Sequence, residues 1–73
     1  MTTLTRIDPE QNMRRFYQLS LQPGLFGDVG LVREWGRIGA AGRSKTDWFE
    51  DEASAEAASD KLARQKQRRG YVL

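Results

Sequence analysis

The sequence predicts an α+β domain built from four β-strands and one C-terminal helix. Four segments, residues 3–8, 13–21, 31–38 and 43–49, are predicted to be strands because their side chains alternate between two faces. Residues 51–69 instead carry a helical pattern with capping signals at both ends. Connections that contain glycine or proline separate most of the predicted elements.

The chain has 73 residues, which corresponds to a single small domain over residues 1–73. Neither cysteine nor histidine occurs in it, so we expect no disulfide framework, no transition-metal site and no cofactor. No apolar run approaches the length of a membrane span, and the N-terminus lacks the features of a signal peptide. The expected location is therefore the cytoplasm, and no membrane partner is expected.

The formal net charge is +2, but the charged residues are unevenly distributed along the chain. Positive side chains predominate before residue 46, an acidic block follows over residues 47–60, and residues 61–69 are basic again. There are nine arginines and three lysines. Arginine is favoured where planar phosphate groups are recognised, so this composition favours a nucleic-acid partner.

Residues 13–21 form the clearest predicted strand. Tyr17, Leu19 and Leu21 fall on one face and are expected to pack in the core beneath the helix. The other face carries Arg14, Phe16, Gln18 and Ser20. If this strand pairs antiparallel with the central strand, its second face shares the outer surface of the sheet with Trp35.

The central strand, residues 31–38, carries the main candidate site. On one of its faces, Val32 and Ile38 can join a core. Arg33 and Arg37 on the other face cannot, so we expect them to face solvent, away from the helix, together with the tryptophan between them. An aromatic ring flanked by two guanidinium groups suits a flat or sugar-like partner that carries phosphates. In the alternative interpretation, a loop covers the tryptophan and the arginines are ordinary solvated charges.

The connections give three further expectations. Residues 3–8 are predicted to form an edge strand that ends at Pro9. Leu25 and Phe26 are too apolar to remain in solvent, so we expect them to fold back and cap one end of the core. Residues 39–42 form a hairpin loop whose glycines permit positive φ. This loop lacks the lysine and hydroxyl residue of a phosphate-binding loop, so we interpret it as a turn.

The last predicted strand ends in two aromatic residues on opposite faces. Alternation alone does not settle which of them is buried; we place Phe49 in the core and leave Trp48 partly exposed. The acidic residues 50–52 that follow could be mistaken for a metal or acid–base site. We interpret them as the negatively charged start of the helix.

The predicted helix has an N-cap at Asp51 and a C-terminal glycine at Gly70. Acidic side chains crowd its first turns and basic side chains its last, as the helix dipole favours. One stripe of the helix is expected to face the sheet: Ala55, Ala58, Leu62 and Gln65. Residues 71–73 are expected to return to the sheet.

The segment Trp35-Gly36-Arg37-Ile38-Gly39 resembles the signature of the WGR domain family, which occurs in poly(ADP-ribose) polymerases and in short bacterial proteins. Further matches extend the resemblance over nearly the whole chain: Asn12, residues 16–21, Gly42, Phe49, the alanines of the helix and Gly70-Tyr71. The connection Leu25-Phe26-Gly27 is similar to that of the compact stand-alone bacterial members. The family implies a four-stranded antiparallel sheet with one helix packed on one face, in agreement with the predicted elements.

The resemblance also implies nucleic-acid binding. In the polymerases, the tryptophan of the signature packs on a sugar near a DNA strand end, and the arginine contacts the backbone there. These roles correspond to Trp35 and Arg37. A polar residue just before the Phe-Tyr pair approaches the terminal phosphate in some members; Arg14 and Arg15 occupy that segment here, and this is a departure in residue type that still suits a phosphate. Tyr71 corresponds to a part of the domain that varies among members.

We expect no enzymatic activity, because the chain has no histidine or cysteine, no serine in a nucleophile context and no paired carboxylates in a plausible cleft. The predicted function is DNA binding, at strand ends or breaks, and RNA is an alternative ligand. The predicted contact residues are Trp35, Arg37, Arg33, Arg14, Arg15 and Tyr71. The alternative function is protein interaction or homodimer formation through the same aromatic patch. A salt titration separates the two, because phosphate binding weakens steeply with salt.

Overall fold

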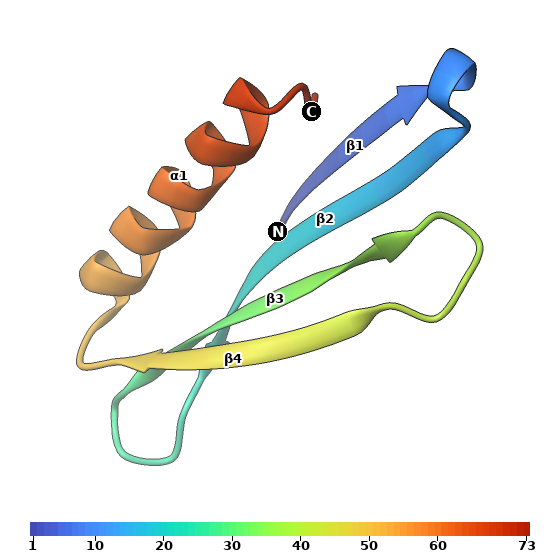
Figure 1. The fold of residues 1–73 in the computed structure, drawn as a ribbon. Coiled ribbons are helices and arrows are strands. Elements are labelled where there is room, and N and C mark those ends of the chain that lie inside the picture. The colour runs from blue at the N-terminus through green and yellow to red at the C-terminus, as the bar shows by residue number, and fades with distance from the viewer.

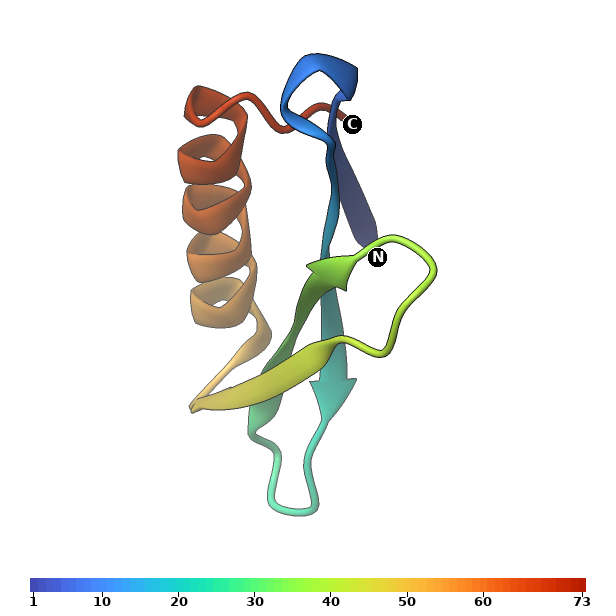
Figure 2. The same cartoon turned by 45° about the vertical axis from the view of Figure 1, so that its right-hand side comes forward.

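Four antiparallel strands form one twisted sheet, and a single helix lies across one of its faces in the computed structural model, which describes residues 1–73 (Figure 1). The strands lie side by side in chain order: β1 (Thr2–Asp8), β2 (Met13–Pro23), β3 (Val29–Arg37) and β4 (Arg43–Phe49). A short 3-10 helix, η1 (Pro9–Gln11), joins β1 to β2, and helix α1 (Glu52–Arg68) follows β4. Figure 2 shows the helix and the sheet as two layers. The predicted fold class is confirmed.

The end of the chain adds a short piece to the edge strand β1. The backbone N–H of Thr5 donates to the carbonyl of Val72, and the N–H of Val72 donates to the carbonyl of Thr5, each at 2.8 Å. The predicted return of residues 71–73 to the sheet is therefore confirmed. This pairing fixes Tyr71 between the end of α1 and β1.

The core lies between α1 and the middle of the sheet. Its fully buried side chains are few: Leu4, Tyr17, Leu19, Leu31 and Ala55. Leu21 and Phe49 pack against this cluster and are half-buried, whereas the side chain of Trp48 is 54% exposed on the other face. The core positions predicted for β2 and the choice of Phe49 over Trp48 are confirmed.

The predicted orientation of β3 was wrong. Tyr17 pairs with Trp35, and Arg15 pairs with Arg37, across the β2–β3 ladder. Residues directly opposite each other share a face of the sheet, so Arg33, Trp35 and Arg37 lie on the side that faces the helix. The outer face of β2, with Phe16 and Gln18, does not share a surface with Trp35. A shift of one residue in the assumed phase reverses every side chain of a strand.

Two physical reasons explain the orientation of β3. The face that was predicted to join the core also carries Gly30 and Gly36, which contribute no side-chain volume. Leu31 on the true inner face is fully buried. Arg33 is tolerated on that face because its guanidinium group donates to the carboxylate of Asp47 on β4 at 3.0 Å.

The expectation that Leu25 and Phe26 cap the core was also wrong, because their side chains are 93% and 91% exposed. The loop between β2 and β3 closes on itself instead. The N–H of Gly24 donates to the carbonyl of Asp28 at 2.9 Å, and the N–H of Phe26 donates to the Asp28 carboxylate at 3.3 Å. These bonds hold the loop as an extension of the hairpin, beyond the end of the core.

Helix α1 has the predicted caps. The backbone N–H of Ser54 donates to the carboxylate of Asp51 at 2.7 Å, and Gly70 adopts a φ of +95° just beyond the C-cap. Most of the predicted stripe, Ala55, Ala58 and Leu62, is buried or half-buried. Gln65 is exposed, because the stripe continues four residues after Leu62, at Lys66.

A change of Asp51→Asn should make the stability of the domain less dependent on pH. The hydrogen bond from Ser54 lowers the pKa of Asp51 below its ordinary value of 3.8. The carboxylate therefore stabilises the folded state above pH 3.8, and this contribution is lost as the pH falls through the lowered pKa. Asparagine keeps the cap without the charge. Thermal melts should give a higher Tm for wild type than for the variant at neutral pH, and equal Tm values in strong acid. The same difference in Tm at every pH would contradict the stabilising role of the Asp51 charge.

Candidate nucleic-acid interface

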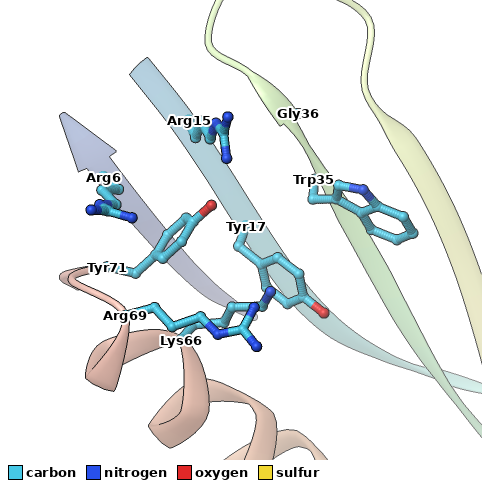
Figure 3. A pocket seen from close by; sticks show the side chains of 8 residues that line it. All are labelled: Arg6, Arg15, Tyr17, Trp35, Gly36, Lys66, Arg69 and Tyr71. Atoms are coloured by element: carbon cyan, nitrogen blue, oxygen red, sulfur yellow. The ribbon is translucent and has the colours of Figure 1, made fainter. Parts of the chain in front are cut away.

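A cavity of about 320 Å³ opens between the C-terminal end of α1 and strands β1 to β3 (Figure 3). We call it the helix-end groove. Its lining comes from β1, β2, β3, the last turns of α1 and the residues that follow the helix: Arg6, Arg15, Tyr17, Trp35, Gly36, Lys66, Arg69 and Tyr71. The groove is open to solvent and contains no carboxylate side chain in its lining.

The groove exists because the helix is shorter than the sheet that it covers. Seventeen helical residues span about 26 Å, whereas the eleven residues of β2 span about 36 Å. The helix starts at the end of the sheet that carries the β2–β3 loop, and it finishes above Tyr17. The next row of the same face, formed by Arg6, Arg15 and Arg37, lies beyond the helix.

Three aromatic rings form the floor of the groove. The rings of Tyr17 and Trp35 are stacked, with centroids 6.2 Å apart and planes 22° from parallel. Tyr71 meets Tyr17 edge-on, with centroids 6.4 Å apart. Tyr17 is buried, whereas Trp35 and Tyr71 are half-buried. Tyr17 therefore anchors two aromatic rings that are themselves only half-buried; Figure 3 shows how the three rings lie.

Gly36 of the signature allows the β3–β4 loop to pack closely on the outer face of the sheet, opposite the groove. A Cβ atom at Gly36 would lie 2.9 Å from the Cα of Gly42 and 3.4 Å from the ring of Phe16. Only glycine accommodates this approach of backbone to backbone. The Gly36 position thus fixes the backbone next to Trp35.

Four cationic side chains, Arg6, Arg15, Lys66 and Arg69, surround the aromatic floor. The Nζ atom of Lys66 lies 4.5 Å from the ring centroid of Tyr17. Burial of Lys66, together with the nearby Arg69 and Arg33 guanidinium groups, holds the pKa of its ammonium below the usual value. An anion bound in the groove would relieve this repulsion.

The predicted contact residues separate into two groups. The structure brings Arg15, Trp35 and Tyr71 together in the helix-end groove, and places Arg37 beside Arg15 on the same face. Arg14 points to the opposite face, where it lines a different hollow with Ile7, Pro9 and Asn12. Its adjacency to Arg15 in the chain explains this result, since neighbouring residues of a strand face opposite sides.

Arg33 lies outside the helix-end groove, in a smaller hollow of about 180 Å³ that it shares with Tyr17, Trp35 and Lys66. We call this the Arg33 hollow. Besides its ion pair with Asp47, Arg33 has a buried Nε atom with no hydrogen-bond partner.

Sequence reasoning missed three cations of the groove: Arg6, Lys66 and Arg69. Arg6 could have been found from its two-residue spacing to the core residue Leu4. Lys66 lies four residues after Leu62, on the stripe that packs against the sheet. Arg69 had no comparable signal, because its position depends on how the end of the helix docks. No group of three or more carboxylates converges anywhere in the structure to form a metal site.

The sequence profile of the WGR domain matches residues 1–73, and the chain therefore belongs to the WGR domain family. In poly(ADP-ribose) polymerases, this domain is a non-catalytic module that binds nucleic acid. The chain is similar to a protein of Sinorhizobium fredii (strain NBRC 101917 / NGR234) that bears the name "Uncharacterized protein y4dW".

The identity to this relative is 47% over 66 residues, which cover 90% of this chain and 32% of the relative. The chain thus spans about a third of the length of the relative that it matches. No solved structure matches the chain.

Proposed function

We propose that the domain binds DNA through the helix-end groove, with strand ends or breaks as its preferred sites. The observation that carries this proposal is the set of four cations around three aromatic rings, with no carboxylate in the lining. Membership of the WGR family supports it, because members of this family bind nucleic acid.

Each part of the groove has a role in the proposed complex. The guanidinium groups of Arg15, Arg6 and Arg69 bind phosphate oxygens by charge-assisted hydrogen bonds. Trp35 offers its accessible face to a sugar or a base. Arg37, in the same row as Arg15, extends the cationic path beyond the groove.

We propose that the domain acts by binding alone. The WGR domain is a non-catalytic module in the family, and the lining of the groove contains no carboxylate, histidine or cysteine.

No helix of the structure is both long and apolar enough to cross a bilayer. We also propose that the domain acts in the cytoplasm.

Binding should depend strongly on salt and on one of two adjacent arginines. The measurement is a fluorescence binding assay with duplex, nicked and single-stranded DNA and with RNA. If about three to five phosphates are neutralised, a plot of the logarithm of the binding constant for duplex DNA against the logarithm of the salt concentration should have a slope of roughly −3 to −4.5. Arg15→Gln should weaken binding and flatten the slope by about one unit. Arg14→Gln, an identical change on the opposite face, should alter neither. A slope near zero, or equal effects of the two variants, would contradict the proposed interface.

The two tryptophans provide a second matched pair. Trp35→Ala should reduce DNA affinity about tenfold or more, because aromatic stacking contributes about 1–3 kcal/mol per base. Trp48→Ala, on the outer face, should leave affinity unchanged. Thermal melts are needed for both, since Trp35 also packs on Tyr17. Full binding by a folded Trp35→Ala variant would refute the role of Trp35.

Tyr17→Ala instead removes core packing and should lower the free energy of unfolding by about 3 kcal/mol or more.

A further inference from the structure

The helix-end groove and the Arg33 hollow are two basic hollows on either side of one aromatic pair. Tyr17, Trp35 and Lys66 line both of them. Arg15 lines only the first hollow and Arg33 only the second. The stacked rings of Tyr17 and Trp35, which belong to the floor of the helix-end groove, therefore also separate it from the Arg33 hollow. We call these two rings the ridge, and a cationic site lies on each side of it.

The sheet register explains this arrangement. On the face that carries the helix, successive cross-strand rows follow each other every two residues, or about 6.6 Å. One row contains Arg6, Arg15 and Arg37. The next contains Tyr17 and Trp35, and the third contains Arg33 and Lys45. Along β3 this face therefore alternates arginine, tryptophan and arginine, whereas the same rows also carry Leu4 and Leu19 on β1 and β2.

The Arg33 hollow retains capacity for an anion although Arg33 already has one carboxylate partner. Asp47 contacts the NH2 group of Arg33 at 3.0 Å and the Nζ of Lys45 at 3.8 Å. The Nε of Arg33 is buried and has no partner. Lys66 adds a second positive charge on the side of the ridge. Arg33 and Lys66 are the two cations of the hollow, and the Asp47 carboxylate balances only one of them, so the hollow keeps a net positive charge.

The geometry points to a second phosphate subsite in the Arg33 hollow. This subsite rests on the DNA-binding function proposed for the groove. The minimal unit that the two sites recognise together is a nucleoside with a phosphate on both its 3′ and its 5′ oxygens. Its sugar or base lies on the accessible side of Trp35. One phosphate contacts the arginines of the helix-end groove, and the other contacts Arg33 and Lys66. Asp47 acts as a positioning residue that holds Arg33 in the hollow.

The ligand is then a nucleotide with a phosphate on each side, as a phosphorylated strand end or a nick provides, rather than an isolated terminal phosphate. A nucleoside with one phosphate fills only one hollow and leaves the other cationic site without an anion. Phosphates on both sides of the ridge engage both sites at once, so the second contact forms without a further loss of translational freedom. The domain should therefore discriminate between nucleotides by the number and placement of their phosphates.

The test is a calorimetric or fluorescence titration with thymidine 3′,5′-bisphosphate, thymidine 5′-monophosphate and thymidine 3′-monophosphate. A nicked DNA duplex is titrated in parallel. Wild type should bind the bisphosphate at least tenfold more tightly than either monophosphate. Arg33→Gln should abolish this preference while it retains binding of at least one monophosphate. Lys45→Gln removes the same charge from the same row, outside the lining of the hollow, and should keep the preference.

The wild-type comparison decides the question even if Arg33→Gln does not fold. Equal affinities of wild type for the bisphosphate and the monophosphates, with normal binding of the duplex, would overturn the second subsite and leave the proposed function intact. A preference that Lys45→Gln loses as fully as Arg33→Gln would also overturn it, since the effect would then be one of net charge. Failure of the duplex to bind would overturn the proposed function itself.

Discussion

The extent to which α1 covers the sheet determines where the core stops and where the surface groove begins. The helix packs over the rows that contain Leu31 and Leu19, and it ends above Tyr17. Beyond that point the same face of the sheet is open, and its next row consists of Arg6, Arg15 and Arg37. One face therefore serves two purposes: its covered part stabilises the fold, and its uncovered part presents charge and aromatic surface.

Tyr17 is the residue at which the two parts meet. Its ring is buried in the core cluster, and it also contacts Trp35, Tyr71 and Lys66 at the groove. Burial of Lys66 and its closeness to the Arg69 and Arg33 guanidinium groups lower the pKa of its ammonium, in a fold whose core consists of four large side chains and one alanine. An anion bound there would offset the repulsion between these cations and would thereby stabilise the fold.

The sequence was sufficient to predict the elements of the fold but not the face on which the site lies. Apolar alternation in β2 identified Tyr17 and Leu19 correctly, and the caps at Asp51 and Gly70 located the helix. Periodicity in β3 defined two faces without showing which of them was the inner one. The charge of Arg33 and Arg37 was the wrong criterion for choosing the outer face, because Arg33 pairs with Asp47 on the inner face. The glycines at positions 30 and 36 were the better signal, because a face without side-chain volume cannot form a core. The place of Arg69 in the groove could not be predicted, because it depends on how the end of the helix docks on the sheet.

The central claim is that nucleic acid contacts the helix-covered face of the sheet, beyond the end of α1. Chemical-shift mapping by NMR, with a labelled domain and a nicked DNA duplex, tests it most directly. Binding beyond the end of α1 should give its largest shifts at Arg15, Tyr71 and the indole N–H of Trp35. Shifts concentrated on the outer face, at Phe16 and Trp48, would contradict it.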